Sequence, residues 1–239
     1  MEYAVYNRNP MYSNSSSIQA NFEETALIPA AVERPQVSLL RPLLDHSFWA
    51  FFRQAEIITG QAFSDSEKRV FMDHAKVKKL RKRQYFLQEG DTCRYLAFII
   101  QGAAKMYSIN ERGQESILSF GMENDWLADM ESFLEKRESA YHIEALEDME
   151  LILLDREQLF RLTGMIPVMN EVLRYFQSRL LIESQKRINS ALSMTAEERY
   201  IHLLQTKPEY AQRFSQNMLA CYLGVKPETL SRIRKHGVC

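Results

Sequence analysis

The spacing of apolar positions predicts a chain that is rich in short strands at first and helical afterwards. Between Lys76 and Leu154, short apolar runs are separated by turn signals such as Glu89-Gly-Asp91 and Asn110-Glu-Arg-Gly113. About six to eight strands at this spacing predict an antiparallel roll or barrel, of the jelly-roll kind. Aromatic residues at 48–52 predict a short helix packed on that body, so the expected fold class is α+β.

A long helix is expected after the roll. Pro167 suits a first helical turn, where its missing N–H is no loss, and the helical pattern continues to about Ser190. Four apolar positions in it repeat at the 4-3-4 spacing of a heptad seam: Met169, Leu173, Phe176 and Leu180. The seam could pack on the roll or join two copies of the chain. The length of the helix favours the dimer.

Residues 215–235 predict two short helices around a tight turn. Ser215 is a good N-cap, Gly224 tolerates a positive φ in the turn, and Pro227 fits the first turn of the second helix. Four polar residues of that helix share a face at i, i+3, i+4 and i+7: Glu228, Ser231, Arg232 and Lys235. A helix-turn-helix is expected, with an ordinary helical hairpin and a solvated charged face as the alternative.

Charge is unevenly distributed along the 239 residues. From Lys186 onward, nine Lys/Arg face four Glu, which gives +5; the rest carries 21 basic and 27 acidic residues, which gives −6, for the total of −1. A basic C-terminal segment on an acidic body is typical of a module that binds a polyanion. A chance excess would look similar, so the charge supports the motif and does not stand alone.

The remaining chemistry of the sequence is sparse. Cys93, Cys221 and Cys239 lie far apart and form no CxxC pair, which argues against a disulfide framework, a zinc site and a cysteine-held iron–sulfur cluster. Apolar runs are too short for a signal peptide or a membrane span, so a cytoplasmic location is expected. No grouping of nucleophile and base points to an enzyme, and no cofactor is expected.

Four segments follow from these patterns. Polar, low-complexity sequence predicts an N-terminal extension of low order over residues 1–44. The roll is expected over 45–165, the long helix with a hinge over 166–192, and the helix-turn-helix domain over 193–239. The hinge is expected near Asn189–Met194, where a change in the roll would alter the spacing of two helix-turn-helix units.

This order of parts resembles the Crp/Fnr superfamily of transcriptional regulators over residues 46–235. Gln88-Glu-Gly-Asp91, Gln101-Gly102 and the segment 110–120 look like the family's first roll turns and strand, and residues 226–232 look like its recognition helix. The resemblance implies a cyclic-nucleotide-binding-like roll and a homodimer. It also implies double-stranded DNA and RNA polymerase as partners.

By that resemblance, Glu228, Ser231 and Arg232 occupy the base-reading positions. A carboxylate can accept from cytosine N4, and an arginine fork can bond guanine O6 and N7, so the residue types suit the role. Phosphate contacts are expected from Ser215, Lys226, Arg234 and Lys235. Glu228 and Arg232 are also an i,i+4 pair that could bond each other. Pro227 replaces an arginine of the cyclic-AMP-responsive branch, so that branch's outer base preference is not expected.

The resemblance also places a phosphate-binding cassette between Phe120 and Ala140. Ala128-Asp129 occupies the family's Gly-Glu position, where Asp129 is a candidate for a ribose hydroxyl, and Glu138-Ser139 occupies the Arg-Ser position. Glu138 places a negative charge where a phosphate needs a cation, a penalty on the order of several kcal/mol. A shift of one residue would let Arg137 point inward instead. The effector, if one exists, is unknown, and cyclic AMP is not expected to be it.

Two functions remain open at this point. The first is a homodimeric, sequence-specific DNA-binding transcription regulator. The alternative is a roll that binds a small molecule, a cyclic nucleotide included, and whose helix-turn-helix no longer binds DNA.

Overall fold

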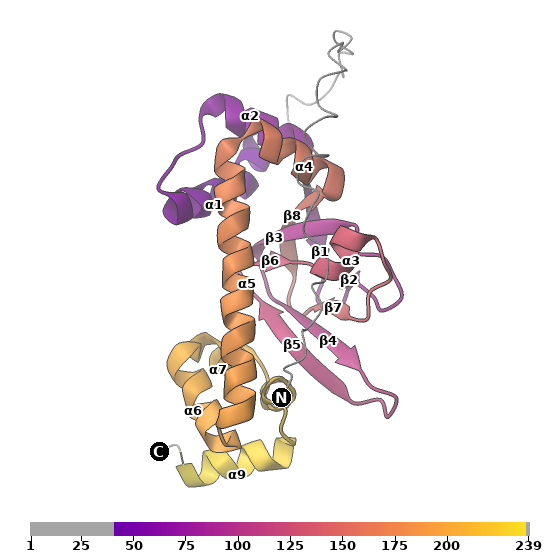
Figure 1. The fold of residues 1–239 in the computed structure, drawn as a ribbon, viewed down its shortest axis with the longest axis vertical. Helices are drawn as coiled ribbons and strands as arrows, with labels where there is room; N and C mark the ends of the chain where they lie inside the picture. Colours follow the sequence, from indigo (N-terminus) through magenta and orange to yellow (C-terminus); the bar gives the residue numbers. More distant parts are fainter. Residues whose placement is uncertain (1–40, 238–239) are drawn as a thin grey trace, which may run out of the picture. The chain divides into compact units, whose positions relative to one another are not determined.

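The computed structural model describes residues 41–237 (Figure 1). Most of the predicted N-terminal extension therefore lies outside the described residues, and residues 41–44 begin helix α1 (Arg41–Thr59). The other elements, in chain order, are α2 (Asp65–His74), β1 (Lys76–Leu80), β2 (Tyr85–Leu87), β3 (Tyr95–Gln101), β4 (Ala104–Ile109), β5 (Glu115–Gly121), β6 (Trp126–Leu127), α3 (Met130–Glu135), β7 (His142–Ala145), β8 (Met149–Asp155), α4 (Arg156–Met165), α5 (Pro167–Ser193), α6 (Ala196–Thr206), α7 (Pro208–Arg213), α8 (Gln216–Leu223) and α9 (Pro227–Gly237).

Two four-stranded sheets form the roll. Their strand orders are β1-β8-β3-β6 and β2-β7-β4-β5, and every recorded pair is antiparallel. In both sheets, strands that are far apart in the sequence are neighbours, as β1 and β8 are. The turns that connect these strands therefore also lie close together. The prediction of an antiparallel roll from short strands and turn signals is confirmed.

An aromatic cluster joins the first two helices to the roll. Phe51 of α1 stacks on Phe71 of α2 with ring centroids 4.3 Å apart, and it meets Phe98 of β3 edge-on at 5.3 Å. Each of these three rings is at most 1% exposed. A Ser64–Glu67 capping box begins α2, and Phe71 of this helix is buried in the cluster.

Helix α5 packs its first turns on the roll and leaves its later turns exposed. Met169 is fully buried in the chain's own core, Leu173 packs against that core, and the Phe176 ring lies 5.8 Å from that of Trp126. Of the four predicted seam positions, only Leu180 is exposed, at 41%. Met169 is therefore unavailable to a second copy. Sequence spacing alone does not distinguish a face packed on a sheet from a face packed on a partner.

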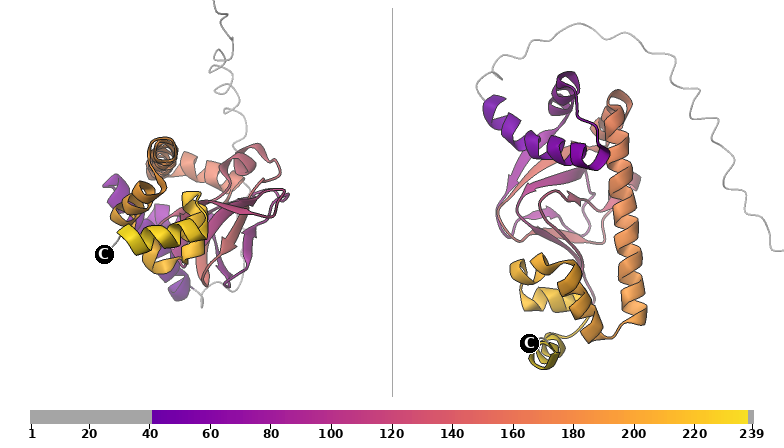
Figure 2. Two further views of the ribbon diagram at one scale, coloured as in Figure 1. Left: turned by 90° about the horizontal axis from the view of Figure 1, so that it is seen from below. Right: turned by 90° about the vertical axis from the view of Figure 1, so that its left-hand side faces the viewer.

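A short break separates α5 from the last four helices. Met194 is extended (φ −111°, ψ 142°), and Thr195 caps α6 in a capping box with Glu198. Residues 189–193, inside the segment where the hinge is predicted, continue α5, so the break in helical structure lies at Met194. The hinge itself stays a prediction. Figure 2 shows α6–α9 gathered beside the last turns of α5.

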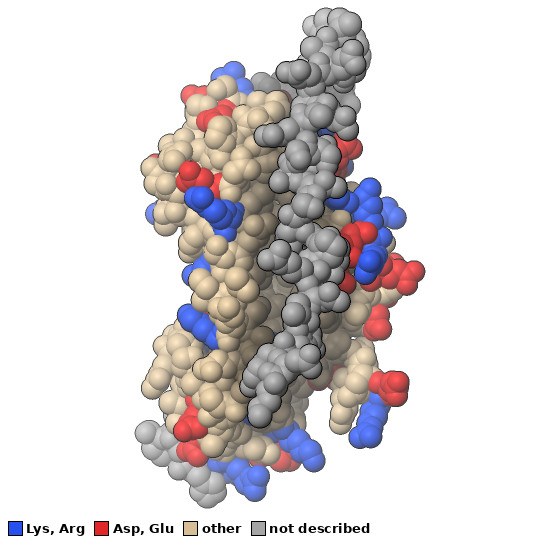
Figure 3. All heavy atoms as spheres, in the orientation of Figure 1, with Lys and Arg blue, Asp and Glu red and all other residues tan. Residues whose placement is uncertain are grey.

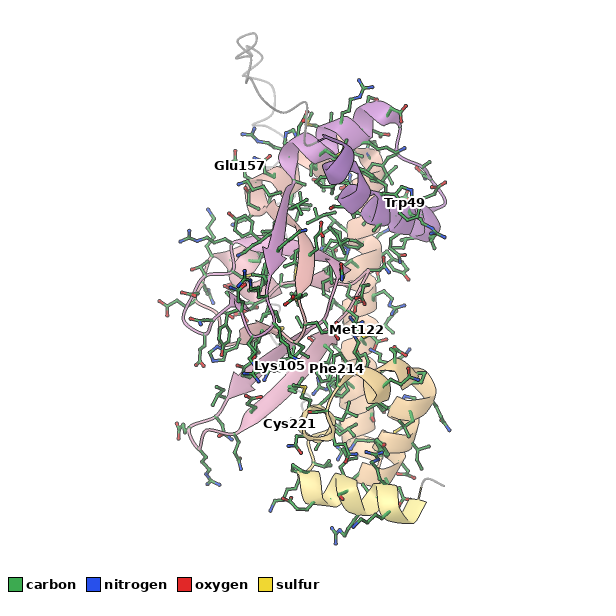
Figure 4. All side chains as sticks on the ribbon, turned by 180° about the vertical axis from the view of Figure 1, so that it is seen from behind. Trp49, Lys105, Met122, Glu157, Phe214 and Cys221 are labelled. Carbon is green, nitrogen blue, oxygen red and sulfur yellow. The ribbon has the colours of Figure 1, made fainter. Side chains whose placement is uncertain are left out.

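The last helices share a second apolar core with the roll. Ile117 and Phe120 of β5 lie in one cluster with Tyr210, Phe214 and Leu219 from α7, the residue after it and α8. In Figure 4, Met122 and Phe214 mark where the turn after β5 meets this region. Between residues 41 and 237, none of the helices has the length and apolar character needed to span a bilayer.

Candidate nucleic-acid interface

The turn between α8 and α9 has the local chemistry that the sequence predicts. The Ser215 hydroxyl accepts from the Met218 N–H (3.3 Å) and so caps α8. Gly224 ends α8 in the left-handed region (φ +67°), and its N–H points to the carbonyls of Ala220 and Cys221. This backbone is strained for any residue with a Cβ. Pro227 then begins α9, as expected.

Apolar side chains fix how α9 crosses α8. Leu219, Ala220 and Leu223 of α8 are buried, as is Leu230 of α9, while Ile233 packs against the same cluster. Ala220 is fully buried, which allows the close approach of the two helices that its small side chain predicts. The apolar face of α9 is thus turned inward, and its charged face is left outside.

The predicted base-reading face is open. Glu228 and Arg232 are exposed and Ser231 is half-buried, with Lys235 exposed one turn further along. Within the described residues, Glu228 and Arg232 form no ion pair with each other, although their spacing allows one. Both side chains are therefore free for an outside partner.

The predicted phosphate-contacting residues lie around that face. Lys226, at the start of α9, and Arg234, near its end, are exposed, and Ser215 is exposed at the start of α8. Figure 3 shows Lys and Arg side chains at the end of the molecule where Figure 1 draws α9. The Ser215 hydroxyl oxygen accepts from the Met218 N–H, and its own O–H remains available to donate to a phosphate.

The cassette at α3 is closed by the chain itself. Asp129 caps α3: its Oδ1 accepts from the N–H groups of Glu131 (3.1 Å) and Ser132 (3.4 Å), and its Oδ2 accepts from the Ser139 hydroxyl (2.7 Å). Asp129, Ser132 and Ser139 are at most 5% exposed. The buried Asp129 carboxylate therefore already accepts the hydrogen bonds that these amides and this hydroxyl would donate to an incoming anion.

The two other charged positions of the cassette face away from it. Arg137 pairs with Glu135 (3.1 Å), and its side chain is 71% exposed, so it does not point inward as a one-residue shift would allow. Glu138 is exposed and forms an isolated β-bridge with Thr92. Ala128 packs against the roll core. These five positions lie together, but they surround no cationic group that could neutralise a phosphate.

Open hollows lie elsewhere on the roll, at β1 and β2. The larger, of about 770 Å³, is lined by Lys78, Lys79 and Arg83 together with Tyr85 and Phe86. No cluster of three or more His, Cys, Asp or Glu suited to a metal ion occurs among residues 41–237.

Comparisons with known proteins agree with this architecture. A family model described as a cyclic nucleotide-binding domain matches residues 77–164. The anaerobic regulatory protein of Haemophilus influenzae is 26% identical over 167 residues, covering 65% of this chain and 64% of that protein, so the chain spans about two thirds of its length. The structure of FixK2 from Bradyrhizobium japonicum is similar with a TM-score of 0.59 and 21% identity, covering 67% of this chain and 83% of that one.

The chain is similar to transcription regulators of the Crp/Fnr superfamily. Another relative, the transcriptional activator protein Anr of Pseudomonas aeruginosa, is 25% identical over 167 residues, covering 65% of this chain and 68% of that protein. The roll and the helices that follow it have a fold similar to that of FixK2.

Two features of this chain were missed from the sequence. Asp129 is a candidate ligand for ribose in the sequence, whereas the structure uses it as the cap of α3; the N-cap preference of Asp two residues before Glu131 was the available signal. The other feature is Arg213, whose two carboxylate partners lie 66 and 90 residues away. No local sequence pattern predicts an ion pair between residues so far apart in the chain.

Proposed function

We propose that the chain is a homodimeric, sequence-specific DNA-binding transcription regulator. The observation that carries the proposal is the free face of α9, on which Glu228, Ser231 and Arg232 stand exposed or half-exposed. Glu228 is suited to accept from cytosine N4, and Arg232 to bond guanine O6 and N7 in the major groove. Lys226, Arg234 and Lys235 supply cations for phosphates, which add affinity without sequence information.

The dimer contact that we propose differs from the predicted seam. Leu181, Ile188 and Leu192 are 60%, 60% and 84% exposed and lie at i, i+7 and i+11 of α5, on one face. Leu180, the exposed member of the predicted seam, lies beside them. An apolar stripe on the free half of a long helix supports pairing with the same helix of a second copy. RNA polymerase would be a further partner of a transcription regulator, and the effector is unassigned.

Selection from a pool of random duplexes tests the proposed DNA binding. The full chain is expected to enrich a two-fold symmetric sequence, because a dimer presents its α9 helices to successive major grooves about one helical turn apart. Sequencing of the bound duplexes after several rounds is the measurement, with a protein-free selection as the control. A bound pool no different from the control would contradict the proposal and favour a roll without DNA binding.

We further propose that cyclic AMP is not the effector. Asp129 already accepts hydrogen bonds from the α3 amides and from the Ser139 hydroxyl, so its own negative charge lies where a phosphate would bind. Isothermal titration calorimetry of the full chain with cyclic AMP is expected to show no binding. An Asp129→Asn variant keeps a side-chain acceptor and removes the charge, so it is the informative comparison. Saturable heat with the wild-type protein would contradict the proposal.

A further inference from the structure

Arg213 joins the helix-turn-helix to two turns of the roll. It is the last residue of α7, two positions before Ser215, the N-cap of α8. Its Nε and Nη2 donate to Glu147 at 2.7 and 2.6 Å, and its Nη1 and Nη2 donate to Glu123 at 2.6 and 2.7 Å. One guanidinium thus holds two carboxylates, each through two hydrogen bonds. Such forked pairs fix direction as well as distance.

The two carboxylates belong to different turns of the roll. Glu123 lies between β5 and β6, and Glu147 lies between β7 and β8. Glu123 Oε1 also accepts from the Gly102 N–H (2.8 Å), which adds the turn between β3 and β4. Gly102 has φ +95°, and a Cβ there would lie 2.5 Å from the Asp148 carbonyl oxygen, so this turn has no room for a side chain. Three turns therefore meet at Arg213.

We call Arg213, Glu123 and Glu147 the Arg213 clamp. In it, one positive side chain is paired with two negative ones. Hydrogen bonds from Arg213 lower the pKa of Glu123 to about 2 and hold the pKa of Glu147 below its ordinary value. The side chains of the three residues are 25%, 36% and 38% exposed, so water screens the attraction. Screening limits what the clamp adds to stability, but the geometry of its hydrogen bonds is unaffected.

Apolar packing beside the clamp holds the helices against the roll. The Phe120 ring stacks on Phe214 with centroids 3.9 Å apart, and Tyr210 and Tyr222 surround the pair. Hydrophobic attraction is non-directional. The forked hydrogen bonds of Arg213 add a fixed direction to this contact.

The clamped arrangement keeps the reading face of α9 available. Contacts with the roll come from α7 and α8, whereas Glu228, Arg232 and Lys235 on α9 remain exposed. A contact that inhibited DNA binding would cover this face instead.

We propose that Arg213 is a positioning residue that sets the orientation of the helix-turn-helix on the roll and thereby supports DNA binding. The inference rests on the proposed function, because its consequence is measured on DNA. Any change in the three turns of the roll would reach α8 through this guanidinium. The clamp is therefore a physical route from roll to DNA that does not pass through α5.

The test compares Arg213→Gln with Arg161→Gln in the full-length chain. Arg161 pairs with Glu157 on the exposed surface of α4, so its variant also removes one arginine from an arginine–glutamate contact, away from the interface. Arg213→Gln is expected to weaken binding to the selected duplex about tenfold, in the range for loss of charged hydrogen bonds. Hydrogen exchange should rise in α7 and in residues 122–125 and 146–148. Arg161→Gln should change neither measurement.

Two outcomes overturn the proposal: unchanged or tighter DNA binding by Arg213→Gln, or unchanged hydrogen exchange in the clamp. Should Arg213→Gln fail to fold, Arg213→Lys keeps the charge without the fork and is expected to give an intermediate loss of affinity. If the wild-type chain binds no duplex, the proposed function fails, and hydrogen exchange still decides whether Arg213 orders the interface.

Discussion

Arg232→Ala is expected to abolish discrimination at one base pair of the DNA site. Arg232 is exposed on α9 and forms no ion pair with another described residue, so its fork is free for a guanine. The expected loss is about 1–3 kcal/mol at that base pair, or roughly 5- to 150-fold in affinity. Competition binding with duplexes that vary one position at a time measures it. An equal loss on every duplex would contradict base reading.

Lys235→Ala is the matched control for that measurement. Lys235 lies three residues further along α9, carries the same charge and is expected at a phosphate. Its removal should weaken binding evenly across sequences and lower the salt dependence by about one unit of slope. Sequence preference should be unchanged. If Arg232→Ala also weakened binding equally on all duplexes, Arg232 would contact only the DNA phosphates.

Phe120→Ala is expected to give the largest loss of stability. Its ring is 5% exposed, stacks on Phe214 and touches Tyr210 and Tyr222, so its removal opens a cavity where the roll meets the last helices. Loss of a buried phenylalanine side chain lowers the free energy of unfolding by about 3–5 kcal/mol. Urea denaturation followed by circular dichroism measures it.

Phe160→Ala provides the comparison. Phe160 is 56% exposed on α4, and a substitution there should change the free energy of unfolding by less than about 0.5 kcal/mol. Equal losses from the two variants would show that Phe120 is not part of a tightly packed core.

Local chemistry made much of this fold predictable. The Ser215 cap and the left-handed Gly224 depend on residues only a few positions apart, and the structure confirms both of them. The alternation of short apolar runs and turn residues likewise predicts the roll, because the sequence of each strand is enough to indicate it.

Features that depend on distant partners were not predictable. The hydrogen bond from Ser139 to Asp129 and the pairing of Arg213 with Glu123 and Glu147 exist only once the chain has folded. The heptad positions show a different difficulty. Met169 and Leu180 have the same spacing signal, but the roll buries the first and leaves the second exposed.

Asp129 gives the roll an anion of its own, joined to the site by the chain. Because Asp129 is part of the chain, its carboxylate competes with a free ligand as if it were present at a high local concentration. For short flexible links this effective concentration reaches the millimolar range. A dissolved phosphate must displace that carboxylate before it gains any contact with α3. Redesigning this chain to respond to a cyclic nucleotide would therefore require removal of Asp129 as well as a cation in place of Glu138.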